Sequence, residues 1–182
     1  MSVKKTLLIA SVVAASFSGN VFAAAENVNT AGKIHFKGQF IDSTCQVETN
    51  NENKTEGTVQ LGTWMTQAFS KAGEKTEATP FTIGLSGCPA TLGKARVTFG
   101  GTEHDDNTDL YKVDNATGVG IGITGSATSE TFYRPNTEAD GIELGKDNRG
   151  QKTYFARYMT TSDTVTPGTA NADVTVTVQY TQ

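Results

Sequence analysis

The C-terminal end of the chain carries the pattern that most constrains its fold. Apolar residues occupy every second position, at Val174, Val176, Val178 and Tyr180, and polar residues stand between them. Alternate side chains of an extended strand share one face, so this segment is expected to be a strand with an apolar and a polar side. Six earlier segments repeat the alternation: Ile34, Phe36 and Phe40; Val59 and Leu61; Phe81, Ile83 and Leu85; Val97 and Phe99; Val119, Ile121 and Ile123; Tyr154, Ala156 and Tyr158. The sequence therefore predicts an all-β sandwich.

The stretch from Trp64 to Ala78 departs from this alternation. Trp64, Ala68, Phe69 and Ala72 recur at spacings of three to four residues, which suits a short helix or an irregular crossover between sheets. No Pro- or Ser-rich linker and no internal repeat divides the chain. A single domain is expected.

Residues 1–23 have the three parts of a secretory signal peptide. Lys4 and Lys5 supply the positive start, Thr6 to Phe17 is mostly apolar, and Val21-Phe22-Ala23 ends in the small residue that signal peptidase requires. The apolar run is shorter than the roughly 20 residues that cross a bilayer, which disfavours a transmembrane anchor. We expect an exported chain that begins near Ala24.

Charge and cysteine content narrow the possible functions. The formal net charge is -4, and removal of the signal lysines makes the mature chain more acidic, so nucleic acid is not an expected partner. Cys45 and Cys88 are the only cysteines. In an oxidising compartment their even number favours one disulfide over two free thiols or a nucleophilic thiol.

Residues Gly120 to Gly125 match the G-x-G-x-x-G spacing of a dinucleotide-binding loop. Apolar residues alternate inside this motif, however, and Ser126-Ala127-Thr128-Ser129 is a poor start for a helix. We therefore expect a strand whose glycines are closely approached by neighbouring backbone.

The acidic run from Glu103 to Asp109 could suggest a metal loop. A calcium loop of the EF-hand type needs a glycine and a glutamate where this chain has Leu110 and Ala116, so a solvated acidic loop is expected. The two histidines, His35 and His104, lie in no nucleophile motif. No catalytic residue, metal, cofactor or small-molecule substrate is expected.

The two termini raise a further possibility. From Val28 on, alternate positions read Val28, Thr30, Gly32, Ile34 and Phe36, which is one face of an extended segment. Such a segment could complete the sheet of another molecule by strand addition, or it could be a frayed end that leads into the first strand. A terminal strand as apolar as Val174 to Tyr180 needs a neighbour on each side. An incomplete sandwich whose N-terminal segment supplies the missing strand to another copy would explain the pattern at both termini.

Several blocks, in order along the whole chain, resemble the major subunits of type 1 and related fimbriae, which the chaperone-usher pathway assembles. The blocks are Gly32-Lys33-Ile34-His35-Phe36-Lys37-Gly38; Cys45 with Cys88; Val59-Gln60-Leu61-Gly62; Phe155-Ala156-Arg157-Tyr158; and Thr166-Pro167-Gly168-Thr169-Ala170-Asn171-Ala172-Asp173 leading into Val178-Gln179-Tyr180.

The resemblance implies an incomplete immunoglobulin-like β-sandwich, a six-stranded pilin fold that a donor strand completes. Residues 1–23 would be the signal peptide, 24–36 the donor-strand extension and 37–182 the pilin domain. The donor face would be Val28, Thr30, Gly32, Ile34 and Phe36; the groove and chaperone-pairing strand would be Gly168, Val174, Val176, Val178 and Tyr180.

The implied partners are identical pilin subunits in a head-to-tail polymer, a periplasmic chaperone and an outer-membrane usher. The implied location is an extracellular fimbrium on a Gram-negative cell, reached through the periplasm. One departure concerns the C-terminus: the family usually places its aromatic residue next to last, whereas Tyr180 is followed by Thr181 and Gln182. A minor or adaptor subunit, a tip adhesin, and a small exported enzyme or metal-binding protein are the alternatives.

Overall fold

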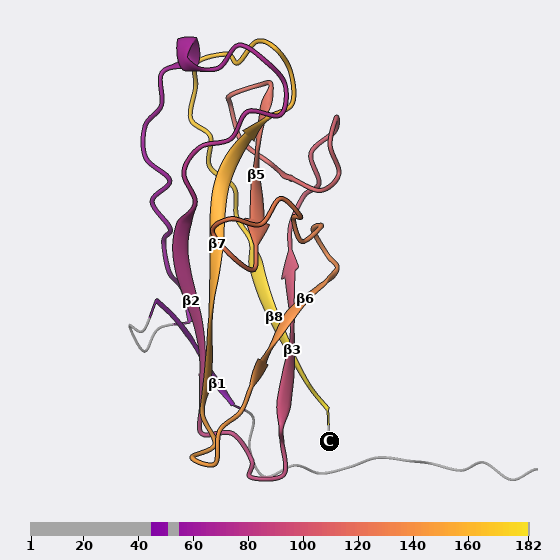
Figure 1. Ribbon diagram of the computed structural model, residues 1–182. Helices are drawn as coiled ribbons and strands as arrows, with labels where there is room; N and C mark the ends of the chain where they lie inside the picture. The colour runs from indigo at the N-terminus through magenta and orange to yellow at the C-terminus, as the bar shows by residue number, and fades with distance from the viewer. Residues whose placement is uncertain (1–44, 51–54, 182) are drawn as a thin grey trace, which may run out of the picture. The chain divides into compact units, whose positions relative to one another are not determined.

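The computed structural model describes residues 45–50 and 55–181, which form two packed antiparallel sheets (Figure 1). One sheet has five strands in the order β1-β2-β7-β5-β4, and the other has three in the order β6-β3-β8. The strands are β1 (Gln46–Thr49), β2 (Thr79–Ser86), β3 (Lys94–Gly100), β4 (Tyr111–Lys112), β5 (Val119–Thr124), β6 (Glu138–Glu143), β7 (Gly150–Thr160) and β8 (Thr175–Thr181). The all-β sandwich predicted from the alternation is confirmed.

The described residues form eight strands rather than the six of the resemblance, and β1, β4, β6 and β8 are the edge strands of the two sheets. The strand expected at Val59 and Leu61 is wrong: no strand is formed there, although both side chains pack partly against the core. Their alternation reflects apolar contact without backbone pairing. The crossover that follows holds one 3₁₀ turn, η1 (Thr66–Ala68), and is otherwise irregular.

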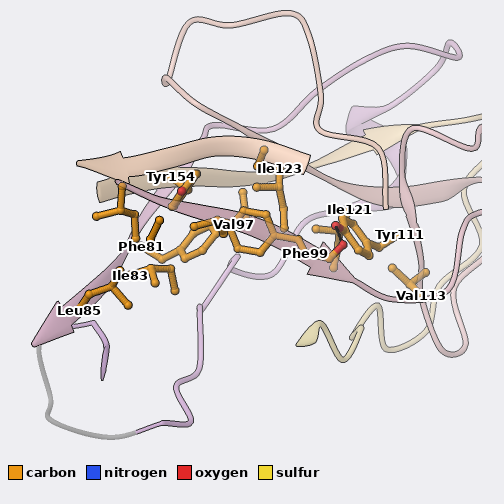
Figure 2. Packing of buried hydrophobic residues seen from close by; sticks show 14 of the residues in the cluster. Phe81, Ile83, Leu85, Val97, Phe99, Tyr111, Val113, Ile121, Ile123 and Tyr154 are labelled. Atoms are coloured by element: carbon orange, nitrogen blue, oxygen red, sulfur yellow. Dashed lines mark hydrogen bonds between the residues drawn. The ribbon is translucent and has the colours of Figure 1, made fainter. Parts of the chain in front are cut away.

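An aromatic cluster occupies the core between the sheets (Figure 2). The rings of Phe99 and Tyr154 meet edge to face with centroids 4.9 Å apart, and Phe81 lies 5.9 Å from Phe99. The buried Tyr154 hydroxyl donates to the carbonyl of Asp140 at 2.5 Å, so its polar atom is satisfied. Burial raises the pKa of Tyr154, which keeps the phenol neutral. Residues from both sheets therefore share one core.

Strand β5 is buried on both faces because loops cover its outer side. A Cβ atom on Gly120 would lie 2.9 Å from Cβ of Leu110, and one on Gly122 would meet the ring of Phe132. Phe132 belongs to the loop between β5 and β6. The Arg157 guanidinium of β7 holds this loop in place, since it donates to the carbonyls of Ala127 at 3.2 Å and Ser129 at 2.6 Å. The G-x-G-x-x-G run is thus a strand whose glycines allow close approach, as predicted.

The disulfide between Cys45 and Cys88 joins the residue before β1 to a residue just beyond β2. These two strands are antiparallel neighbours, with Gln46 opposite Ser86. The crosslink therefore closes the end of the five-stranded sheet at which β1 begins.

Replacement of Gly122 by Ala should destabilise the protein by about 1–3 kcal/mol, because the new methyl group overlaps the Phe132 ring and displaces its loop. Urea unfolding of the purified protein measures the change. Gly93→Ala is the control, since no atom lies within 4 Å of a Cβ built there. Equal midpoints for the two variants would show that the covering loop yields without cost.

Removal of the disulfide by paired Cys45→Ser and Cys88→Ser changes should lower the free energy of unfolding by about 4 kcal/mol, because the crosslink restricts the unfolded chain. Thermal unfolding in the presence and absence of a reductant checks this. The double serine variant should be insensitive to the reductant, and a wild-type protein that is equally insensitive would contradict the prediction.

Candidate functional site

Strand β8 forms one edge of the three-stranded sheet, and among the described residues it pairs with β3 alone (Figure 1). Tyr180 lies opposite Ala95, Val178 opposite Val97, and Val176 opposite Phe99. The three β3 side chains are fully buried, so their β8 partners face the same interior side. The β8 side chains are nevertheless only partly buried. This apolar face lacks cover from the described residues on the side away from β3.

Residues 56–64 run past the other side of the core without joining a strand. They make no backbone–backbone hydrogen bond to any other described residue, although Val59 and Leu61 pack partly against the core. Side-chain donors reach two of their carbonyls, since Asn50 donates to Thr58 at 3.5 Å and the Trp64 indole donates to Leu61 at 2.8 Å.

An open cavity of about 800 Å³ lies between the residues that follow Leu61 and the segment that leads into β8. Residues 62–67 line one wall, residues 165–171 line the other, and Ala116, Val119 and Tyr158 contribute apolar surface between them. Trp64 and Met65 are the large hydrophobic residues exposed among those described, at 42% and 80%, and both lie on this cavity. Exposed apolar surface around a cavity indicates a site where another segment binds.

The wall formed by residues 165–171 is tied to the segment between β4 and β5. The amides of Asn115 and Ala116 donate to the carbonyl of Thr169 at 3.1 and 2.9 Å, and the amide of Asp114 donates to the carbonyl of Asn171 at 3.0 Å. Gly168 lies so close to this backbone that a Cβ atom there would be 3.0 Å from the Ala116 nitrogen. A side chain at position 168 would therefore separate the two segments.

The Asp114 carboxylate adds side-chain hydrogen bonds to the same wall. It accepts from the amide of Asn171 at 3.0 Å, the hydroxyl of Thr169 at 2.8 Å and the side-chain amide of Asn171 at 3.2 Å. These donors, the Asn171 amide first, lower the pKa of Asp114 below its usual value. The carboxylate therefore stays ionised, and the contacts persist, well into mild acid.

The predicted groove residues Gly168, Val174, Val176, Val178 and Tyr180 all lie on β8 or on the segment that leads into it. The predicted donor residues Val28, Thr30, Gly32, Ile34 and Phe36 lie outside the described residues. Sequence reasoning missed the cavity wall at Trp64 and Met65 and the contacts of Asp114. The interruption of the alternation after Leu61 was the available signal for the first.

Two carboxylates of the acidic loop pair with basic side chains. Asp105 binds Lys112 at 2.6 Å, which lowers the pKa of Asp105, and Glu103 pairs with Arg134 at 3.1 Å. His104 is buried, and its Nδ1 accepts from the Asp106 amide at 3.1 Å. Across residues 45–50 and 55–181 there is no group of three or more His, Cys, Asp or Glu side chains placed to hold a metal ion.

Within those same ranges the structure contains no helix of the length and apolarity required to span a membrane.

The sequence profile of the fimbrial protein family matches residues 34–181. The chain belongs to this family. It is 36% identical to the probable major fimbrial subunit LpfA of Escherichia coli O157:H7 over 97% of each chain. It is also 34% identical to the type-1 fimbrial protein A chain of Escherichia coli K12, over 97% of this chain and 98% of the relative.

Solved structures show the same fold. The rod subunit PapA of the P pilus superposes with a TM-score of 0.62 at 19% identity, covering 76% of this chain and 100% of PapA. A subunit of a chaperone-usher pilus gives 0.61 at 21% identity, covering 84% of this chain and 96% of that chain. The chain is a structural subunit of a chaperone-usher pilus with the immunoglobulin-like pilin fold.

In this fimbrial subunit, Val178→Asp should reduce the yield of fibres at least about tenfold, because a carboxylate on the apolar face of β8 loses its hydration when the site is filled. Thr177→Asp is the matched control, since Thr177 is the next residue along β8 and points outward. Sheared surface fibres can be quantified for both. Normal fibre yield from Val178→Asp would contradict the assignment of this face.

Proposed function

We propose that this fimbrial subunit polymerises by donor-strand exchange, in which residues 24–36 of one copy fill the site beside β8 of the next. The observation that carries the proposal is the one-sided pairing of β8, whose inward face remains partly exposed although its β3 partners are fully buried. An added strand would cover that face and pair with the free edge.

Strand addition would use both the main-chain hydrogen-bonding groups and the apolar side chains of the site. Main-chain hydrogen bonds from the free edge of β8 supply affinity without regard to sequence, and recesses between alternate side chains supply specificity. The proposed donor face, Val28, Thr30, Gly32, Ile34 and Phe36, has the same two-residue period as Val174, Val176, Val178 and Tyr180. Equal periods allow one side chain of the donor to meet each recess.

The partners and the route follow from the same requirement. A chain with an unfilled site exposes apolar surface and a free strand edge, both of which favour aggregation. We infer that a periplasmic chaperone covers the site first and that an outer-membrane usher exchanges it for the donor segment of the next subunit. Residues 1–23 would direct export, residues 37–182 would form the pilin domain, and the fibre would lie outside the cell.

We further infer that the subunit is a non-enzymatic component of the shaft, with no metal, cofactor, nucleic acid or small-molecule substrate. The support is the similarity, over nearly its whole length, to a relative named as a probable major fimbrial subunit. A minor or adaptor subunit is the second candidate, because membership of the fimbrial protein family does not specify a subunit's place in the fibre. Quantitative mass spectrometry of purified fibres separates the two, since a shaft subunit should be present in great excess.

The donor face can be tested with neighbouring residues of opposite orientation. Ile34→Asp should abolish polymerisation, because residue 34 would enter the apolar site, whereas His35→Asp should leave it intact, because residue 35 would face away. Surface fibres are examined by detergent electrophoresis with and without boiling. Cold samples of the His35 variant should retain high polymers that become monomers when heated.

A mixing experiment separates donor defects from acceptor defects. The Ile34→Asp subunit should still accept a donor peptide of residues 24–40, and the Val178→Asp subunit should not. Normal polymers from Ile34→Asp, or peptide uptake by Val178→Asp, would overturn donor-strand exchange at this site.

A further inference from the structure

The wall of the cavity formed by residues 165–171 is held in place mainly by hydrogen bonds rather than by burial. Thr166 to Thr169 are exposed, and only Val165 and Ala170 are partly buried. Exposed segments usually depend on local polar contacts for a fixed shape. The contacts of this wall therefore decide whether it is in position before a strand arrives.

Most of these contacts converge on a short segment after β4. Asp114 binds Thr169 and Asn171 through its carboxylate, at 2.8 to 3.2 Å. The side-chain amide of Asn115 donates to the Thr169 hydroxyl at 2.6 Å, and the Tyr158 hydroxyl donates to the carbonyl of Ala170 at 2.9 Å. Asp114 is the one charged acceptor in this set, and hydrogen bonds to a charged acceptor are stronger than neutral ones.

Asp114 is not one of the residues that line the cavity of about 800 Å³, and it lines instead a smaller hollow beside Val113 and Asn171. Its carboxylate oxygens are occupied by Thr169 and Asn171, which do line the larger cavity. An effect of Asp114 on strand uptake would therefore act through the wall and not through contact with the strand.

We propose that Asp114 is a positioning residue for strand uptake, which holds residues 166–171 as a preformed wall of the cavity before the donor strand arrives. This inference rests on the donor-strand exchange proposed above. A wall that is already in place spares the incoming strand the cost of ordering it. Without the carboxylate, residues 166–171 adopt several arrangements, of which only one receives the strand. The apparent rate of uptake then falls in proportion to the fraction of molecules in that arrangement.

The test uses the mature chain bound to its periplasmic chaperone and a fluorescein-labelled peptide of residues 24–40, which ends at the last apolar residue of the N-terminal alternation. Uptake is followed by the appearance of a labelled band in cold detergent gels. Asp114→Ala should slow uptake by about tenfold, as expected when about one molecule in ten has the receptive wall. Asp114→Asn should recover part of the rate, because its carboxamide oxygen can still accept from Thr169 and Asn171.

Two further variants distinguish positioning from a general loss of stability. Asp173→Ala removes another exposed carboxylate close to the same segment and should keep the wild-type rate. Thr169→Val removes the hydroxyl that donates to Asp114, so it should slow uptake by about threefold on its own. Added to Asp114→Ala it should slow uptake by less than threefold, because the Asp114–Thr169 hydrogen bond is already lost and only the Asn115–Thr169 contact is left to break.

A wild-type rate for Asp114→Ala, or effects that multiply in the double variant, would overturn the role of Asp114. If Asp114→Ala yields no chaperone complex, Thr169→Val decides the question alone, and a wild-type rate for it would overturn the proposal. Failure of the wild-type complex to take up the peptide would instead overturn donor-strand exchange itself, so the two proposals fail in different ways.

Discussion

The one-sided pairing of β8 is the constraint on which the other features of this subunit depend. Ala95, Val97 and Phe99 of its partner β3 are fully buried. The register between the two strands therefore places the apolar residues of β8 beside the centre of the core. A strand in that position belongs to the core on one side and, among the described residues, has no neighbour on the other. Unpaired backbone groups and exposed apolar surface are both costly in water, which is the physical basis of the strand addition proposed above.

The five-stranded sheet is well covered by loops, whereas the apolar face of β8 is only partly buried. Its strand β5 is buried on both faces, and its glycines bring two loops within contact distance of the backbone. Arg157 fixes one of these loops through the carbonyls of Ala127 and Ser129. The disulfide ties the ends of β1 and β2 together. These contacts stabilise the five-stranded sheet, whereas β8 lies at the edge of the other sheet.

Most of the fold could be predicted from the sequence because one period governs it. The alternation in β2, β3 and β8 is set by a core on one side and solvent on the other, and this signal is local. The strand predicted at Val59 and Leu61 was wrong because apolar alternation reports burial, whereas a strand also requires a hydrogen-bonding neighbour. No local pattern reveals whether that neighbour exists.

The contacts of Asp114 could not be predicted from the sequence for a related reason. Its partners Thr169 and Asn171 stand more than fifty residues away along the chain. Gly168 did stand out through the resemblance, but its physical role, the close approach to the Ala116 backbone, is visible only once the two segments are side by side. Long-range polar contacts between exposed loops have no periodic signature, so sequence reasoning finds the strands of this site more readily than the wall beside them.

The segment 166–171 and the segment 56–64 differ in a way that bears on how a strand would enter. Residues 166–171 make backbone and carboxylate hydrogen bonds to the segment after β4, so their shape is independent of an occupant. Residues 56–64 contribute Val59 and Leu61 to the core but make no backbone–backbone hydrogen bond with the other described residues. Under the proposed exchange, a strand would meet residues 166–171 already in position, whereas residues 56–64 have only side-chain hydrogen bonds to their backbone among the described residues. The segment 166–171 can set the register of the new strand, while pairing along the segment 56–64 and β8 supplies the affinity.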